Sequence, residues 1–195
     1  MSLNSAIETD KRVLKDDYCN FDLIARCWND EYRGRVWKNK ERIADCEGAD
    51  LDEIMRELRR IVDELQHQKR ERRGRRKPSA REIADAIADV EPKLSRAQKM
   101  MLAIHAKAPG HRLMVKAITR VGDYAGPQPA LLDYARLGQR LCDELAYHPV
   151  GSRHRESVSG TTILFAEEIS LDDIGLDTVL TMRRELAQAL ELLKW

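Results

Sequence analysis

Apolar residues recur at three- and four-residue spacing along most of this chain, a pattern that predicts amphipathic helices. The clearest case spans Leu51–Arg73 and follows Asp50, which can cap a helix. Its apolar positions stop at Leu65 while polar helix formers continue, so we expect the helix to run on into solvent as a basic arm. Those apolar positions are Leu51, Ile54, Leu58, Ile61 and Leu65.

The segment before this helix, about Ile7–Asp45, also favours a helix, with Gly34 as a possible break. A plausible buried face consists of Phe21, Leu23, Ile24, Cys27, Trp28 and Tyr32. Two of the three tryptophans of the chain fall in this segment. We therefore expect the segment to dock on something, either its own chain or a partner.

Two capping boxes mark helix starts further along the chain. Ser79-Ala80-Arg81-Glu82 predicts a helix over Ala80–Val90, and Ser95-Arg96-Ala97-Gln98 predicts one over Arg96–Ala106. Two further helices are expected over Lys116–Tyr124 and Pro129–Tyr147. Gly138 lies on the apolar stripe of the last one and costs about 1 kcal/mol relative to alanine, which suggests that another helix passes close by.

One strand is expected over Thr161–Phe165, where β-branched and aromatic residues cluster. Its partner would lie near His111–Val115 or Pro149–Gly151. Asp177 then caps a last helix over Thr178–Lys194. The expected fold is mainly α: a helical N-terminal extension, a winged-helix-like domain with a small β hairpin, and a C-terminal helix. The corresponding regions are 1–77, 78–170 and 171–195.

Two stretches, Leu51–Leu65 and Val179–Leu193, have heptad-like apolar spacing. Both can serve as seams of a homo-oligomer, most simply a dimer. The alternative is that each helix packs on its own domain. Trp195, the last residue, adds apolar surface that another chain could cover.

Composition excludes several classes of protein. The chain has 195 residues, of which 43% are apolar and 34% are charged, and it lacks an apolar run near the roughly 18 residues that span a bilayer. The N-terminal residues show no signal-peptide pattern. We expect a cytoplasmic protein without a membrane role. The four cysteines are scattered and form no C-x-x-C, which argues against disulfides and structural zinc.

Charge is unevenly distributed although the net charge is only +1. Residues 1–68 carry 12 basic and 16 acidic residues, and residues 161–195 carry three basic and seven acidic residues. The run 69–77 carries seven basic residues and one acidic residue, and residues 93–155 carry 11 basic and four acidic residues. A basic middle between acidic ends is expected for a polyanion-binding protein. The alternative is a protein whose acidic ends neutralise its own basic middle.

No sequence motif indicates catalysis. The chain lacks nucleotide-binding glycine loops, a nucleophile elbow and H-E-x-x-H. His148 and His154 with Asp143 are a poor metal-ligand set, because they extend across a helix end and a loop. We predict that the protein is not an enzyme and binds neither a cofactor nor a metal.

The order of elements over residues 95–168 resembles a winged helix-turn-helix module of prokaryotic mobile-element or defence proteins. Ser95–Ala106, Lys116–Tyr124 and Pro129–Tyr147 would be its three helices, and Val150–Phe165 its wing. The stretch from Tyr124 to Gly138 resembles the turn and helix of such modules. This resemblance implies DNA binding through the third helix and the wing, and no more, because the nuclease domains sometimes attached to such modules have no counterpart here.

If the module is present, the third helix would read bases in the major groove through Gln128, Arg136, Gln139 and Arg140. Phosphates would be contacted by Arg153 and Arg155 of the wing and by the basic run, in particular Arg72, Arg73, Arg75 and Arg76. Asp133, Asp143 and Glu144 on the same helix oppose this interpretation, since they repel phosphates. The alternative is a scaffold helix with an ordinary solvated face.

The sequence therefore predicts a non-enzymatic protein that binds duplex DNA, such as a regulator or accessory factor of a phage or mobile element. The alternative is a helical interaction or assembly protein without a nucleic-acid role.

Overall fold

The computed structural model describes residues 13–147, 160–166, 169 and 174–195. The chain divides into two compact units, Met1–Gln68 and Lys69–Trp195. Helix α1 (Leu51–Arg73) contributes most of its length to the first unit and its last residues to the second. None of the helices among the described residues is long and apolar enough to cross a membrane.

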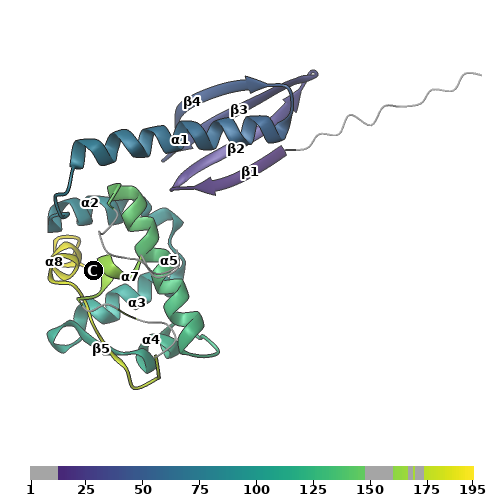
Figure 1. Ribbon diagram of the computed structural model, residues 1–195. Coiled ribbons are helices and arrows are strands. Elements are labelled where there is room, and N and C mark those ends of the chain that lie inside the picture. The colour runs from purple at the N-terminus through teal and green to yellow at the C-terminus, as the bar shows by residue number, and fades with distance from the viewer. Residues whose placement is uncertain (1–12, 148–159, 167–168, 170–173) are drawn as a thin grey trace, which may run out of the picture. The chain divides into compact units, whose positions relative to one another are not determined.

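The first unit is built on a four-stranded antiparallel sheet with the strand order β1-β2-β3-β4 (Figure 1). The strands are β1 (Val13–Tyr18), β2 (Phe21–Trp28), β3 (Glu31–Lys38) and β4 (Glu41–Gly48). Each hairpin turn has two residues, and all six turn residues have positive φ. That is the type I′ geometry, whose twist matches the twist of the flanking strands. The turns are Cys19-Asn20, Asn29-Asp30 and Asn39-Lys40.

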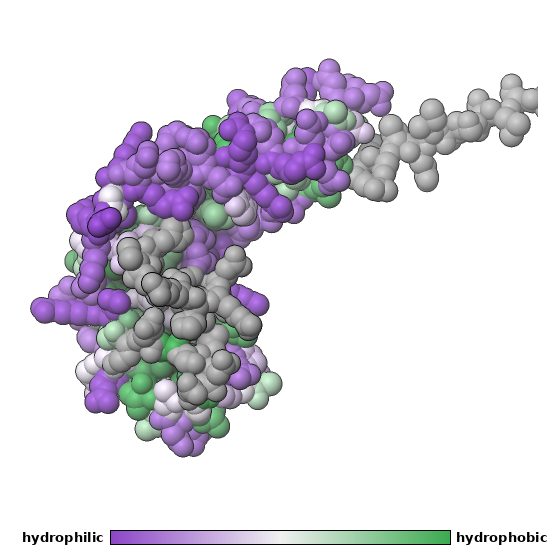
Figure 2. Space-filling view, in the orientation of Figure 1, coloured by the Kyte–Doolittle hydropathy of each residue, from purple (hydrophilic) through white to green (hydrophobic). Residues whose placement is uncertain are grey.

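Helix α1 packs on one face of this sheet. Leu23, Val36 and Leu58 are fully buried between the two. The approach is closest at Gly34, where an added Cβ would lie 2.4 Å from Ile54 Cγ2. The opposite side of α1 is strongly hydrophilic (Figure 2), so the helix has one apolar side, and the sheet covers it.

The prediction of a mainly α fold with a helical N-terminal extension is wrong. The segment predicted as helix over Ile7–Asp45 forms the four strands, and the protein is mixed α/β with a large sheet. Its apolar residues alternate in β2, where Phe21, Leu23 and Ala25 point toward α1. Ile24 and Trp28 on the other face are also apolar, and they produced the helix-like spacing. Helix α1 itself has the predicted bounds.

The second unit is mainly helical. Its first half contains α2 (Ala80–Val90), the 3-10 turn η1 (Glu91–Lys93), α3 (Arg96–Lys107), η2 (Pro109–His111), β5 (Arg112–Met114) and α4 (Val115–Val121). Its second half contains α5 (Pro127–Leu145), α7 (Thr161–Leu164), β6 (Val179–Thr181) and α8 (Arg184–Leu192). Both predicted capping boxes are confirmed, at Ser79 with Glu82 and at Ser95 with Gln98.

Helix α5 is the centre of this unit and packs against α2, α3, α4 and α7. A chain segment does pass close to Gly138, as its position on the stripe suggested. An added Cβ there would lie 2.0 Å from the carbonyl oxygen of Gly160, the residue before α7. Glycine at both positions lets the two backbones touch.

The predicted β elements of this unit are partly wrong. Thr161–Phe165, predicted as a strand of the wing, is mostly the helix α7, and Phe165 makes only an isolated bridge to Met182. The extended stretch near His111–Val115 is confirmed as β5, but it pairs with β6. The predicted helix over Thr178–Lys194 begins only at Arg184, because its first residues form β6. The β-branched residues of 161–165 favour a strand by propensity, but in the structure Thr161, Ile163 and Leu164 are buried as part of helix α7.

Apart from the exposed Val179, the apolar positions of both heptad-like stretches pack within their own units. Ile54 and Leu58 are buried beneath the sheet, and Ile61 and Leu65 pack against the same cluster. In the second stretch Leu186 is fully buried. The C-terminal Trp195 packs against the core of the second unit.

Candidate functional site

The face of the N-terminal sheet that points away from α1, here called the outer face, carries an ordered array of charged and aromatic side chains. The register of the four strands places them in rows that run across the sheet. The first row is Val13, Arg26, Arg33 and Glu47; the second is Lys15, Ile24, Arg35 and Asp45; the third is Asp17, Asp22, Trp37 and Arg42. Trp28 and Glu31 pair beyond the first row, beside the β2–β3 turn.

Three arginines lie together in the middle of this face. Arg26 on β2 is directly opposite Arg33 on β3, and Arg35 is two residues further along β3. Like charges opposite each other on a sheet are destabilising. A local conflict of this kind, on a face that the described residues of the first unit leave exposed, is typical of a binding site.

Carboxylates at the margins of the face partly balance the arginines. Arg33 lies 2.5 Å from Glu31 and 3.5 Å from Glu47, and Arg35 lies 3.3 Å from Asp45. All of these side chains are more than a third exposed. Exposed pairs of this kind contribute about 0–1 kcal/mol each, so an anionic ligand can displace them at small cost.

Both tryptophans of the segment lie on the outer face. Trp28 is 61% exposed, and the Arg26 guanidinium lies 5.6 Å from its ring centroid. Trp37 is half-buried. Val13 in the same array is also exposed. A large exposed indole beside arginine is expected where a protein contacts a partner or a nucleic acid.

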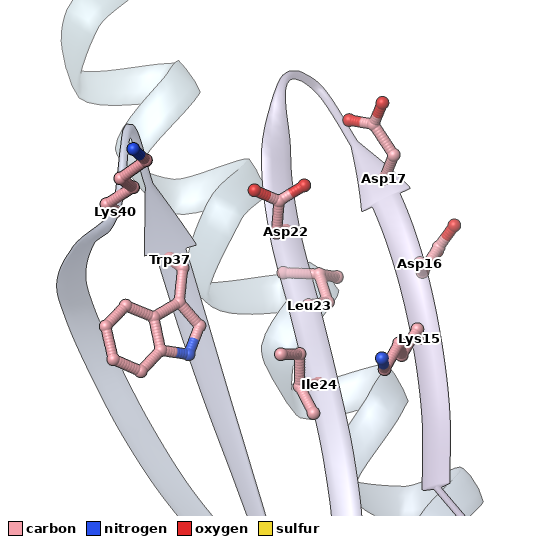
Figure 3. A pocket seen from close by; sticks show the side chains of 8 residues that line it. All are labelled: Lys15, Asp16, Asp17, Asp22, Leu23, Ile24, Trp37 and Lys40. Carbon is pink, nitrogen blue, oxygen red and sulfur yellow. The ribbon is translucent and has the colours of Figure 1, made fainter. Parts of the chain in front are cut away.

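A shallow hollow of about 630 Å³ adjoins the arginines on this sheet. Trp37, Ile24 and Lys15 lie side by side on three adjacent strands, and Asp17, Asp22 and Lys40 lie toward one end (Figure 3). The hollow therefore combines an aromatic ring, an apolar floor, and charges of both signs.

The residues of the basic run 69–77 fall into two groups. Arg76 donates two hydrogen bonds to Glu82, at 2.8 and 2.7 Å, and Arg73 lies 3.3 Å from the same carboxylate. The Arg76 hydrogen bonds, followed by the Ser79 backbone amide, lower the pKa of Glu82 from 4.5 to about 2. Arg72 and Arg75 are exposed. Arg73 and Arg76, two of the four arginines predicted to contact phosphates, therefore form ion pairs with a residue in the first turn of α2.

The same run also supports the end of α5. Lys69 donates to the carbonyl of Glu144, and its Nζ lies 3.3 Å from the Glu144 carboxylate. Arg73 donates to the carbonyl of Leu145 at 2.6 Å. These cations satisfy carbonyls that the last turn of a helix leaves without partners.

The predicted reading helix α5 is largely enclosed. Ten of its nineteen residues are buried. Gln128 and Arg136 are exposed, while Gln139 and Arg140 are half-buried, and Gln139 donates to Asp143 at 2.7 Å. Asp133 accepts from Tyr124 at 2.5 Å and from Gln98 at 3.1 Å. The helix thus presents one narrow stripe, and the predicted wing residues Arg153 and Arg155 lie outside the described residues.

The described residues contain no group of three or more histidine, cysteine or acidic side chains arranged to hold a metal ion. Burial raises the pKa of the Cys142 thiol to about 12. This cysteine is therefore a small apolar core residue at neutral pH.

No protein-family model, curated protein or solved structure matches this chain. We therefore infer its ligand from the residues themselves.

The sequence reasoning missed the outer face, because it assigned Arg26, Arg33, Arg35 and Trp37 to a helix. A usable signal was present. Short polar pairs recur every ten residues at Cys19-Asn20, Asn29-Asp30 and Asn39-Lys40, and eight-residue strands joined by two-residue turns have this period.

Proposed function

We propose that this protein is a non-enzymatic DNA-binding protein that contacts duplex DNA with the outer face of its N-terminal sheet. The observation that carries the proposal is the cluster of Arg26, Arg33 and Arg35, between two tryptophans, on a sheet face that no described element of the first unit covers. Arg33 and Arg35 pair with exposed carboxylates, and such pairs are weak, so a phosphate can replace them at small cost. Arginine binds phosphates well, often through two parallel hydrogen bonds.

The three arginines lie on β2 and β3, the central strands of the sheet, and point to the same side of it. The major groove of DNA is about 12 Å wide and admits a two-stranded β-ribbon. Four strands about 4.8 Å apart are wider than that groove, so the outer face would lie against the phosphate backbone. In this arrangement the arginines would contact phosphates, and Trp28, next to the β2–β3 turn, would add an aromatic contact.

The salt dependence of binding follows from the number of cations. Lys15, Arg26, Arg33 and Arg35 are the cations of the first two rows. If about four phosphates are neutralised, log K falls with log salt concentration with a slope of about −3.6. Affinity should then drop on the order of 100-fold between 50 and 200 mM salt.

The experiment measures binding of the full-length protein to a labelled duplex by fluorescence anisotropy over this salt range. The variant Arg26→Ala with Arg33→Ala should bind at least about tenfold more weakly at 50 mM salt, with a slope smaller by roughly two. The matched control, Arg56→Ala with Arg60→Ala, removes the same charge from exposed positions of α1 and should bind like the wild type.

Two outcomes would contradict the proposal. Absence of binding by the wild type at 50 mM salt would remove the DNA-binding function. If Arg136→Ala with Arg140→Ala were the variant that lost binding, the site would instead be the stripe on α5 that the resemblance implies.

A protein partner is the second candidate, and the carboxylates on the outer face favour it. Glu31, Asp45 and Glu47 each pair with an arginine, and exposed tryptophan and arginine are enriched at the centres of protein interfaces. Such a partner would bind the wild-type protein with a weak salt dependence. The cytoplasmic location, the prokaryotic origin, the homo-oligomer and the role in a phage or mobile element stay predictions from the sequence.

A further inference from the structure

The hollow beside the three arginines has the features of a site for a single nucleobase. Ile24 forms its floor, Trp37 stands on one side, and Lys15 stands on the other (Figure 3). The hollow has a volume of about 630 Å³ and is shallow, so it would hold a planar ring against the sheet rather than enclose a ligand. Aromatic side chains on an open sheet are surfaces on which unpaired bases stack, because every base has a π-face.

The hollow is lined by charges of both signs. Lys15 lies in the same cross-strand row as Arg35, so the hollow borders the arginines of the outer face. Asp17 and Asp22 lie toward the opposite end of the hollow, and Lys40 lies at that end too. A backbone phosphate would be attracted to Lys15 and Arg35, and a hydrogen-bond donor on the base would be attracted to the two carboxylates.

Resting on the proposed DNA-binding function, we propose that this hollow binds one unpaired base of the DNA, and specifically a base with an exocyclic amino group. Asp22 would accept a hydrogen bond from that amino group, as carboxylates do from cytosine N4. Thymine has the carbonyl oxygen O4 in place of the amino group and only its N3–H to donate, so it would bind Asp22 less well than cytosine. A base within the duplex exposes only its edges, so stacking on Trp37 requires the base to leave the helix.

The test compares three labelled duplexes that are identical except at one position. The first is fully paired, the second carries a single bulged cytosine, and the third carries a single bulged thymine. The full-length protein should bind the cytosine bulge at least about fivefold more tightly than the paired duplex, the lower end of what one stacked base contributes. The thymine-bulge duplex should show a smaller increase in affinity over the paired duplex.

Two variants separate stacking from hydrogen bonding. Trp37→Ala should abolish the preference for bulged DNA, so that the three duplexes bind with equal affinity, while Trp37→Phe should retain part of the preference. Asp22→Asn should reduce the difference in affinity between the cytosine-bulge duplex and the thymine-bulge duplex. Circular dichroism confirms that each variant is folded.

Equal affinity of the wild type for the three duplexes would overturn the base site and leave the proposed function standing. Failure to bind any of the three would overturn the proposed function itself. A bulge preference that persists in Trp37→Ala would place the unpaired base elsewhere.

Discussion

Replacing Glu82 by glutamine removes the charge on which two arginines of the basic run converge. Glutamine can still complete the capping box with Ser79, so the substitution tests the ion pairs rather than the cap. The pKa of Glu82 falls from 4.5 to about 2 in the folded protein, mainly through the Arg76 hydrogen bonds. Such a shift corresponds to at most about 3 kcal/mol of stability. Since Arg76 is 61% exposed, solvent screening reduces this to about 1–2 kcal/mol.

The pH dependence has a definite sign. A carboxyl whose pKa is lowered on folding stabilises the native state above its unfolded pKa, near 4.5, and the contribution is lost as the pH falls toward about 2. In scanning calorimetry at pH 7, Glu82→Gln should lower the Tm of the second unit by about 3–10 °C. The difference from the wild type should shrink as the pH falls below about 4.5 and be small near pH 2.

Asp85→Asn is the matched control, because Asp85 also pairs with an arginine, Arg81 at 3.3 Å, but both side chains are more than 60% exposed. It should change the Tm little. Equal stability of Glu82→Gln and the wild type at pH 7 would show that Arg73 and Arg76 are not engaged by this carboxylate and belong with the exposed cations of the run.

Three further predictions concern the core of the second unit. Gly138→Ala should destabilise it by at least about 2 kcal/mol in urea denaturation despite the gain in helix propensity, because the new methyl group meets the Gly160 carbonyl 2.0 Å away. Burial lowers the pKa of His105 below 6.5, so stability should fall as the pH drops below about 6.5, and the pH profile of His105→Gln should lack this component. Leu186 is fully buried, so Leu186→Asp should unfold the unit, seen as loss of the cooperative melting transition, rather than produce a folded monomer.

The tautomer of His105 follows from its two hydrogen bonds. Its Nε2 lies 3.1 Å from the carbonyl oxygen of Leu180, so that nitrogen carries the proton and donates. Its Nδ1 then accepts from the Tyr134 hydroxyl at 3.2 Å. Both ring nitrogens have partners in the neutral form, and a second proton on Nδ1 would require the Tyr134 hydroxyl to turn and accept instead of donate.

The helices with strong local signals could be predicted from the sequence. Helix α1 follows from its apolar spacing and the Asp50 cap, whose carboxylate accepts from the Glu53 amide at 2.7 Å. The starts of α2 and α3 follow from capping boxes, which are local features of four residues. In each of these cases the residues that decide the structure are neighbours in the sequence.

The outer face could not be predicted in the same way. Ile24 and Trp28 are apolar on the uncovered side of β2, so the alternation of a half-buried strand is blurred. Position 34 carries glycine because α1 packs directly against it, a reason that only the tertiary structure supplies. Arg26 lies opposite Arg33 because of the register of two strands, which the order of residues along the chain does not reveal.

The indole N–H signals of the protein provide the most direct test of binding through the outer face. The chain has three tryptophans: Trp28 and Trp37 lie on the outer face, and Trp195 packs in the second unit. In two-dimensional NMR of the full-length protein titrated with duplex DNA at 50 mM salt, the Trp28 and Trp37 indole signals should shift or broaden while the Trp195 signal stays. A shift of Trp195 with Trp28 and Trp37 unchanged would contradict the proposed interface.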